Sequence, residues 1–125
     1  MNYRLSYYFK RPHRFVEEIY DKIKWFIQRG KRGYSDYDTW SFDVYIVGVL
    51  AGGLKHLSKH AAGFPGNDEF PTWESWSDKL KEVAEVLEKY DKIFDIMDLK
   101  EEEKIYNDTQ EALKWVAENV GALWD

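Results

Sequence analysis

The densest group of side chains able to bind a ligand lies between residues 29 and 43. Residues 29–36 read RGKRGYSD, and Trp40 follows shortly after. Cations, aromatic rings and the free N–H groups at the start of a helix are elements that bind phosphates and bases. We therefore predict that a nucleotide-like anionic ligand is bound by Arg29, Lys31, Arg32, Tyr34, Ser35, Asp36, Trp40 and Asp43. Against this, Asp36 and Asp38 would repel an anion unless they pair with the arginines.

Two carboxylates in this segment share one face of a predicted helix. Asp36 precedes Asp43 by seven residues, almost two helical turns. As a functional pair they could hold a divalent metal or carry out acid–base chemistry. We favour a structural role, because a buried carboxylate such as Asp43 needs a charged or hydrogen-bonding partner. Arg29 and Arg32 are its nearest cations in sequence.

Other chemical motifs are missing from the sequence. The absence of cysteine excludes thiolate nucleophiles and cysteine-based zinc or iron–sulfur sites. No phosphate-binding loop, dinucleotide fingerprint, nucleophile elbow or HExxH zinc motif is present. His56 and His60 are spaced i, i+4, but two histidines without a third ligand indicate a metal only weakly. We predict no catalytic residue, no metal and no cofactor, and expect binding more than catalysis.

Composition narrows the possible partners. The chain of 125 residues is 44% hydrophobic and 33% charged, as expected of one globular domain spanning residues 1–125. Aromatic residues are enriched at 18%, which suits a core, a recognition surface or both. The net charge of −5 argues against binding duplex nucleic acid. Nine basic and three acidic side chains lie in residues 1–34. This basic segment either binds anions or packs beside acidic helices.

The sequence predicts no contact with a membrane. The longest apolar run, residues 44–54, is about half the length of a membrane span and contains three glycines. The first ten residues lack the apolar region of a signal peptide. A cytoplasmic location is therefore expected.

The first third of the chain predicts an arm and a helix. Tyr3, Leu5, Tyr7 and Phe9 alternate with more polar residues, which predicts an extended aromatic N-terminal arm. A helix is expected over residues 13–29, because Pro12 suits a helix start and Gly30 a helix end. One stripe of this helix is apolar and consists of Phe15, Val16, Ile19, Tyr20, Ile23, Phe26 and Ile27.

A second helix is predicted over residues 36–60. Ser35 and Asp38 have the spacing of a capping box at its start. The helix is apolar almost all round, which predicts a buried helix in the centre of a bundle. Two opposite apolar sides are more than a small bundle can cover, so we also predict a homo-oligomer, most simply a dimer.

The remaining sequence predicts two more helices. Thr72 is a suitable N-cap, and a heptad-like seam then runs from Trp73 to Met97. Whether one helix continues through residues 91–97 is left open, and a final helix is expected over residues 101–123. The fold class is thus all-α, a small helical bundle whose core includes Trp40, Val47, Leu50, Leu54, Leu80, Val83, Leu87 and Val116.

Residues 25–36, WFIQRGKRGYSD, continue with Asp38, Trp40 and Asp43. The resulting pattern, R-G-Y-S-D-x-D-x-W-x-x-D, resembles a family of small proteins encoded by bacteriophages and prophages. Further matches are the G-F-P at residues 63–65 and the L-W-D at residues 123–125. The resemblance covers most of the chain and implies a phage setting, without implying an activity.

We therefore expect a phage accessory protein that acts by binding in the host cell cytosol. The leading hypothesis is a counter-defence protein, which sequesters a nucleotide immune signal or masks a host defence protein. The alternative is a structural or assembly protein of the phage particle. A small hydrolase that uses Asp36, Asp43 and a divalent metal is the least favoured of the three.

Overall fold

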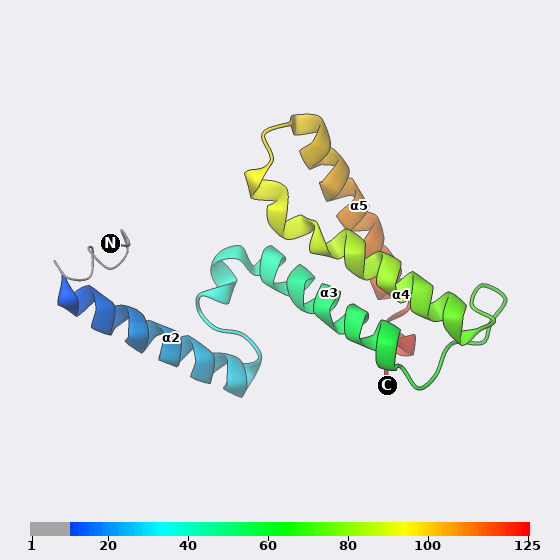
Figure 1. Cartoon of the computed structure of the whole chain (residues 1–125), viewed down its shortest axis with the longest axis horizontal. Helices are drawn as coiled ribbons and strands as arrows, with labels where there is room; N and C mark the ends of the chain where they lie inside the picture. Colours follow the sequence, from blue (N-terminus) through cyan, green and yellow to red (C-terminus); the bar gives the residue numbers. More distant parts are fainter. Residues whose placement is uncertain (1–10) are drawn as a thin grey trace. The chain divides into compact units, whose positions relative to one another are not determined.

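The computed structural model describes residues 11–125, and these form two compact units (Figure 1). The first unit ends at Phe42 and the second runs from Asp43 to Asp125. The prediction of an all-α fold is confirmed, because every regular element over residues 11–125 is helical. The predicted N-terminal arm lies outside the described residues. The elements are α2 (Pro12–Arg32), η1 (Asp38–Ser41), α3 (Phe42–His60), α4 (Trp73–Glu88), η2 (Tyr90–Asp95), α5 (Leu99–Glu118) and η3 (Val120–Ala122).

Helix α2 begins at Pro12, one residue before the predicted start, and runs past Gly30 to Arg32. Gly33 ends the helix instead, with a φ of 85° in the left-handed region that glycine adopts without strain. Its N–H donates a hydrogen bond of 2.9 Å to the Arg29 carbonyl. The predicted end at residue 29 is therefore wrong. Arg29 and Arg32 lie in the last turn of α2, where cations are stabilised by the helix dipole.

The predicted capping contact between Ser35 and Asp38 is confirmed. The Ser35 N–H donates to Asp38 Oδ2 over 2.8 Å, and the Asp38 N–H donates to Ser35 Oγ over 3.2 Å. These bonds begin the 3₁₀ helix η1 rather than an α-helix. Helix α3 starts only at Phe42, six residues later than the predicted start.

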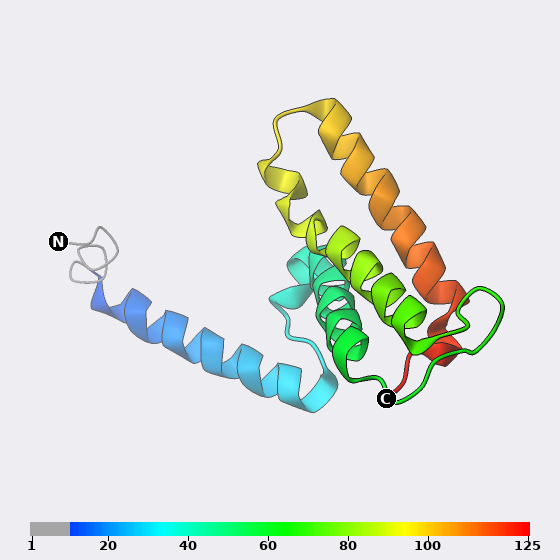
Figure 2. The same ribbon diagram turned by 45° about the vertical axis from the view of Figure 1, so that its right-hand side comes forward.

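The second unit contains α3, α4 and α5 packed around one apolar core. Helix α4 lies between the other two (Figure 2) and contributes the most buried side chains. Its first turn carries the predicted cap, because Thr72 Oγ1 accepts from the Ser75 N–H at 3.1 Å. The core consists of Val47, Ala51, Leu54, Phe70, Trp76, Leu80, Val83, Ala84, Leu87, Tyr90, Ile93, Ala112 and Val116.

Helix α3 buries one face and not its whole circumference. Val47 and Leu54 face the core as predicted, whereas Leu50 is partly buried. Ile46 and Val49 on other sides of α3 are exposed, so the prediction of a helix buried almost all round is wrong. A unit of three long helices has only one central position, and α4 occupies it. The other core predictions in this unit, Leu80, Val83, Leu87 and Val116, are confirmed.

The structure answers the question left open for the third helix, and it shifts the last helix, α5, to Leu99–Glu118 from the predicted residues 101–123. Helix α4 ends at Glu88, and the seam continues through the 3₁₀ helix η2 and not as one helix to Met97. Asp98 caps α5, because its Oδ1 accepts from the Lys100 N–H at 2.9 Å. None of the helices over residues 11–125 is long and apolar enough to cross a membrane.

Candidate functional site

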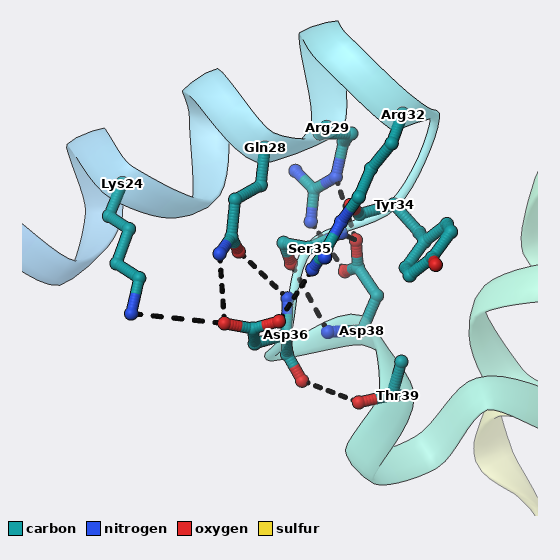
Figure 3. Close-up of polar contacts among 9 residues, drawn as sticks. All are labelled: Lys24, Gln28, Arg29, Arg32, Tyr34, Ser35, Asp36, Asp38 and Thr39. Carbon is teal, nitrogen blue, oxygen red and sulfur yellow. Dashed lines mark hydrogen bonds and ion pairs between the residues drawn. The ribbon is translucent and has the colours of Figure 1, made fainter.

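The segment after α2 folds back against one side of that helix, and together they form the candidate site (Figure 3). Gln28 binds Asp36 at two points. Its amide donates to Asp36 Oδ2 over 2.8 Å, and its Oε1 accepts from the Asp36 N–H over 2.9 Å. The rings of Trp25 and Tyr37 pack with centroids 4.8 Å apart. We call residues 33–41, which follow α2, the return turn.

Asp38 is the buried anchor of the return turn. Arg29 donates to both of its carboxylate oxygens, from Nε over 3.0 Å and from Nη2 over 2.5 Å. Asp38 is only 7% exposed and Ser35 is fully buried. The hydrogen bonds from Arg29, followed by those from Ser35, lower the pKa of Asp38 to about 2. The carboxylate is therefore ionised at neutral pH.

Asp36 holds the exposed side of the return turn. It accepts from Arg32 Nη2 over 2.5 Å, and Lys24 Nζ lies 3.8 Å from its Oδ2. The hydrogen bonds from Gln28 and then Arg32 lower the pKa of Asp36 below its ordinary value. Arg32 also donates from Nε to the Tyr34 carbonyl over 2.9 Å, and its guanidinium lies 4.5 Å from the centre of the Tyr34 ring.

The charges of the predicted anion site thus largely neutralise one another. Arg29 pairs with Asp38, and Arg32 pairs with Asp36. These are the pairs that the sequence analysis required if Asp36 and Asp38 were not to repel an anion. Among the predicted cations over residues 29–32, Lys31 has no ion pair in the part of the chain that the structure describes. The guanidinium groups serve to hold the return turn in shape.

The return turn carries three exposed aromatic side chains, Tyr34, Tyr37 and Trp40. Trp40 is 88% exposed and Tyr37 is 59% exposed, while Tyr34 lies edge-on to Phe42 with ring centroids 6.1 Å apart. The prediction that Trp40 belongs to the core is wrong. It assumed an α-helix from Asp36 onward, whereas η1 has the tighter turn of a 3₁₀ helix and directs Trp40 outward.

Asp43 takes no part in the return turn and belongs to the second unit. Its Oδ2 accepts a hydrogen bond of 2.6 Å from the hydroxyl of Tyr90, which raises the pKa of Tyr90 to about 12. Asp43 itself is exposed, so the prediction of a buried carboxylate paired with Arg29 or Arg32 is wrong. An exposed carboxylate at the start of α3 needs no arginine, because water and the helix dipole stabilise it.

The sequence reasoning missed Trp25 and Gln28 as members of the site. Both lie on the polar side of α2, which also carries Arg29 and Arg32 at helical spacing. The sequence does contain a signal for Trp25 and Gln28. Four long side chains share one helix face, and a turn with two aspartates follows directly.

Possible metal ligands do not converge in the described part of the chain. No group of three or more His, Asp and Glu side chains over residues 11–125 is placed to hold a metal ion. The rings of His56 and His60 lie with centroids 4.5 Å apart on the exposed side of α3. These are the two histidines at i, i+4 spacing noted in the sequence.

No protein-family model, curated protein or solved structure matches this chain.

Proposed function

We propose that this chain acts by binding a protein partner through the exposed aromatic side chains of the return turn, Tyr34, Tyr37 and Trp40. The observation that supports this most directly is the exposure of Trp40 on a turn fixed by the Arg29–Asp38 ion pair. Tryptophan and tyrosine are the residues most enriched at the energetic centres of protein interfaces.

The rigidity of the return turn supports a binding role. An aromatic side chain on a flexible loop loses conformational freedom on binding, whereas a fixed one has less to lose. Ion pairs and hydrogen bonds hold the backbone on both sides of Tyr37 through Asp36 and Asp38. The side chain of Trp40 can therefore enter a pocket on a partner at low entropic cost.

The charge pattern favours a protein over a small anion. A nucleotide would have to compete with Asp36 and Asp38 for the guanidinium groups of Arg29 and Arg32. That competition would break charge-assisted hydrogen bonds, which are roughly twice as strong as neutral ones. Lys31 alone offers one flexible point charge to an anion.

The phage setting implied by the resemblance indicates which kind of protein the partner would be. A phage accessory protein of this kind would mask a host defence protein, and Trp40 would supply the central contact. The proposal thus retains the counter-defence hypothesis in its protein-masking form. Sequestration of a nucleotide signal and assembly of the phage particle become alternative outcomes of the experiment.

The experiment is capture from extracts of infected host cells on the immobilised chain, followed by mass spectrometry of bound proteins and of small molecules released by heat. Trp40→Ala should reduce capture of the partner at least about tenfold, because truncation of a central tryptophan commonly costs 2 kcal/mol or more. Phe94→Ala, which removes another exposed ring, is the matched control and should leave capture unchanged. Circular dichroism should show unaltered helix content in both variants.

Other outcomes would contradict the proposal. Recovery of a nucleotide whose binding survives Trp40→Ala but not Lys31→Ala would indicate sequestration. Capture of particle proteins alone would indicate assembly, and turnover of nucleotides with Mg²⁺ or Mn²⁺ would indicate an enzyme.

A further inference from the structure

The apolar stripe of α2 faces away from the return turn. At about 100° per residue, Trp25 lies half a turn around the helix from Val16, and Arg32 lies almost as far. The return turn packs on the Trp25 and Arg32 side. Helix α2 has no buried residue, and all seven large side chains of its stripe are exposed: Phe15, Val16, Ile19, Tyr20, Ile23, Phe26 and Ile27.

We infer that this stripe binds the same stripe of a second copy, with the two α2 helices antiparallel about a two-fold axis near residue 21. This inference goes beyond the proposed function. It uses the side of α2 opposite Trp25 and Arg32, with Lys24 at the border between the two surfaces. Val16, Ile19, Ile23 and Phe26 follow the alternating three- and four-residue spacing of a helix–helix seam.

The order of the apolar residues is nearly the same in both directions from residue 21. An antiparallel pair therefore places Val16 opposite Phe26 and Ile19 opposite Ile23. A small side chain then faces a large one at the ends of the seam, and β-branched side chains meet at its centre. A parallel pair would instead place the two Phe26 rings together and the two Val16 side chains together.

Charges beside the seam are complementary in the antiparallel orientation. Glu17 and Lys24 lie within about 20° of each other around the helix, on the same flank of the stripe. In an antiparallel two-fold pair, each flank faces its own symmetry mate. Glu17 of one copy therefore meets Lys24 of the other, whose ammonium also lies 3.8 Å from Asp36 Oδ2 of its own return turn.

The size of the stripe suits a dimer. A covered aromatic ring buries about 150–250 Å², and the stripe adds four aliphatic side chains to the rings of Tyr20 and Phe26. The area available approaches the roughly 800 Å² per partner of a standard protein interface. In a two-fold dimer each residue contact across the interface occurs twice. A single substitution on the stripe therefore changes two contacts.

The test is the dissociation constant of the full chain, measured by sedimentation equilibrium over a micromolar concentration series. We expect a reversible dimer, and Ile23→Asp should weaken it at least about tenfold by burying two unpaired charges. Met97→Asp, at a side chain that is 99% exposed in the second unit, is the control and should leave the dimer unchanged. A wild-type chain that is monomeric throughout the series would overturn the inference.

Charge exchange tests the orientation and does not depend on Ile23→Asp remaining folded. Glu17→Lys and Lys24→Glu should each weaken the dimer about two- to fivefold per contact, and the double variant should restore it. A double variant as weak as the singles would overturn the antiparallel arrangement. Trp40→Ala should not alter the dimer, so failure here and failure of the proposed function can be told apart.

Discussion

Arg29 and Asp38 form a two-point ion pair that joins the last turn of α2 to the first residue of η1. Asp38 also accepts the N–H of the fully buried Ser35, so one carboxylate joins the end of α2, Ser35 and the start of η1. The geometry of this ion pair explains why Arg29 acts as a scaffold for the neighbouring aromatic side chains and is not free to bind an anion.

Removal of the Asp38 carboxylate should loosen the return turn. Asp38→Ala leaves the buried Ser35 N–H without its acceptor and Arg29 without this partner, which we expect to cost about 1–3 kcal/mol. Amide hydrogen exchange across residues 33–41 should accelerate correspondingly. Asp36→Ala is the control at an exposed position and should have a smaller effect. Equal protection in wild type and Asp38→Ala would contradict the anchoring role.

Acid should weaken the return turn through the same residue. The pKa of Asp38 is about 2 in the folded chain against an ordinary 3.8. Because the folded value is the lower one, the stabilisation is fully present above pH 3.8 and is lost as the pH falls toward 2. Carboxyl NMR titration of Asp38 should show the low value directly. Asp38→Asn should remove this component of the pH dependence of exchange in the return turn.

Tyr90 should lose its proton at a higher pH than an ordinary tyrosine. Its hydroxyl donates to Asp43, which raises the pKa of Tyr90 to about 12 from an ordinary 10.0. The raised folded value means that this stabilisation is present below pH 10 and is lost as the pH rises toward 12. Tyrosinate absorbance should show a component that titrates near pH 12 and is assigned to Tyr90. Asp43→Asn should return its pKa toward 10, and an unchanged titration would contradict the contact.

Leu54 should matter more to stability than Leu50. Leu54 is 1% exposed in the core, so Leu54→Ala should cost about 2–5 kcal/mol through the cavity that it leaves. Leu50 is only partly buried, and Leu50→Ala should cost less. Ile46→Ala, on the exposed side of α3, should change the free energy of unfolding by less than about 0.5 kcal/mol. Urea unfolding measures all three, and the reverse order would show that the wrong face of α3 is buried.

Helical periodicity predicted the helices themselves well, because spacings of three and four residues persist through α2, α3, α4 and α5. Their ends were harder to predict. Gly30 and Gly33 are both suitable helix terminators, and only the contacts of the return turn decide that Gly33 adopts the left-handed conformation.

The segment predicted to form the site does fold against α2, and Asp36 pairs with the basic stretch as expected, but the partner of Arg29 was assigned incorrectly. The prediction continued one helical phase from Asp36 through Trp40 to Asp43. The 3₁₀ turn η1 interrupts that phase, so Asp38 and not Asp43 meets Arg29, and Trp40 faces outward. A short 3₁₀ turn leaves no periodic signal in a sequence, because it contains too few residues to repeat.

The contacts that attach the return turn to α2 join residues close together in the chain. Arg32 and Asp36 are four residues apart, Gln28 and Asp36 eight, Arg29 and Asp38 nine. Loops of this length close in about 10–100 ns, much faster than a ribosome adds a residue at about 5–20 per second. The return turn can therefore form while the second unit is still being synthesised. During that interval, Trp40 would already be presented on a chain whose core does not yet exist.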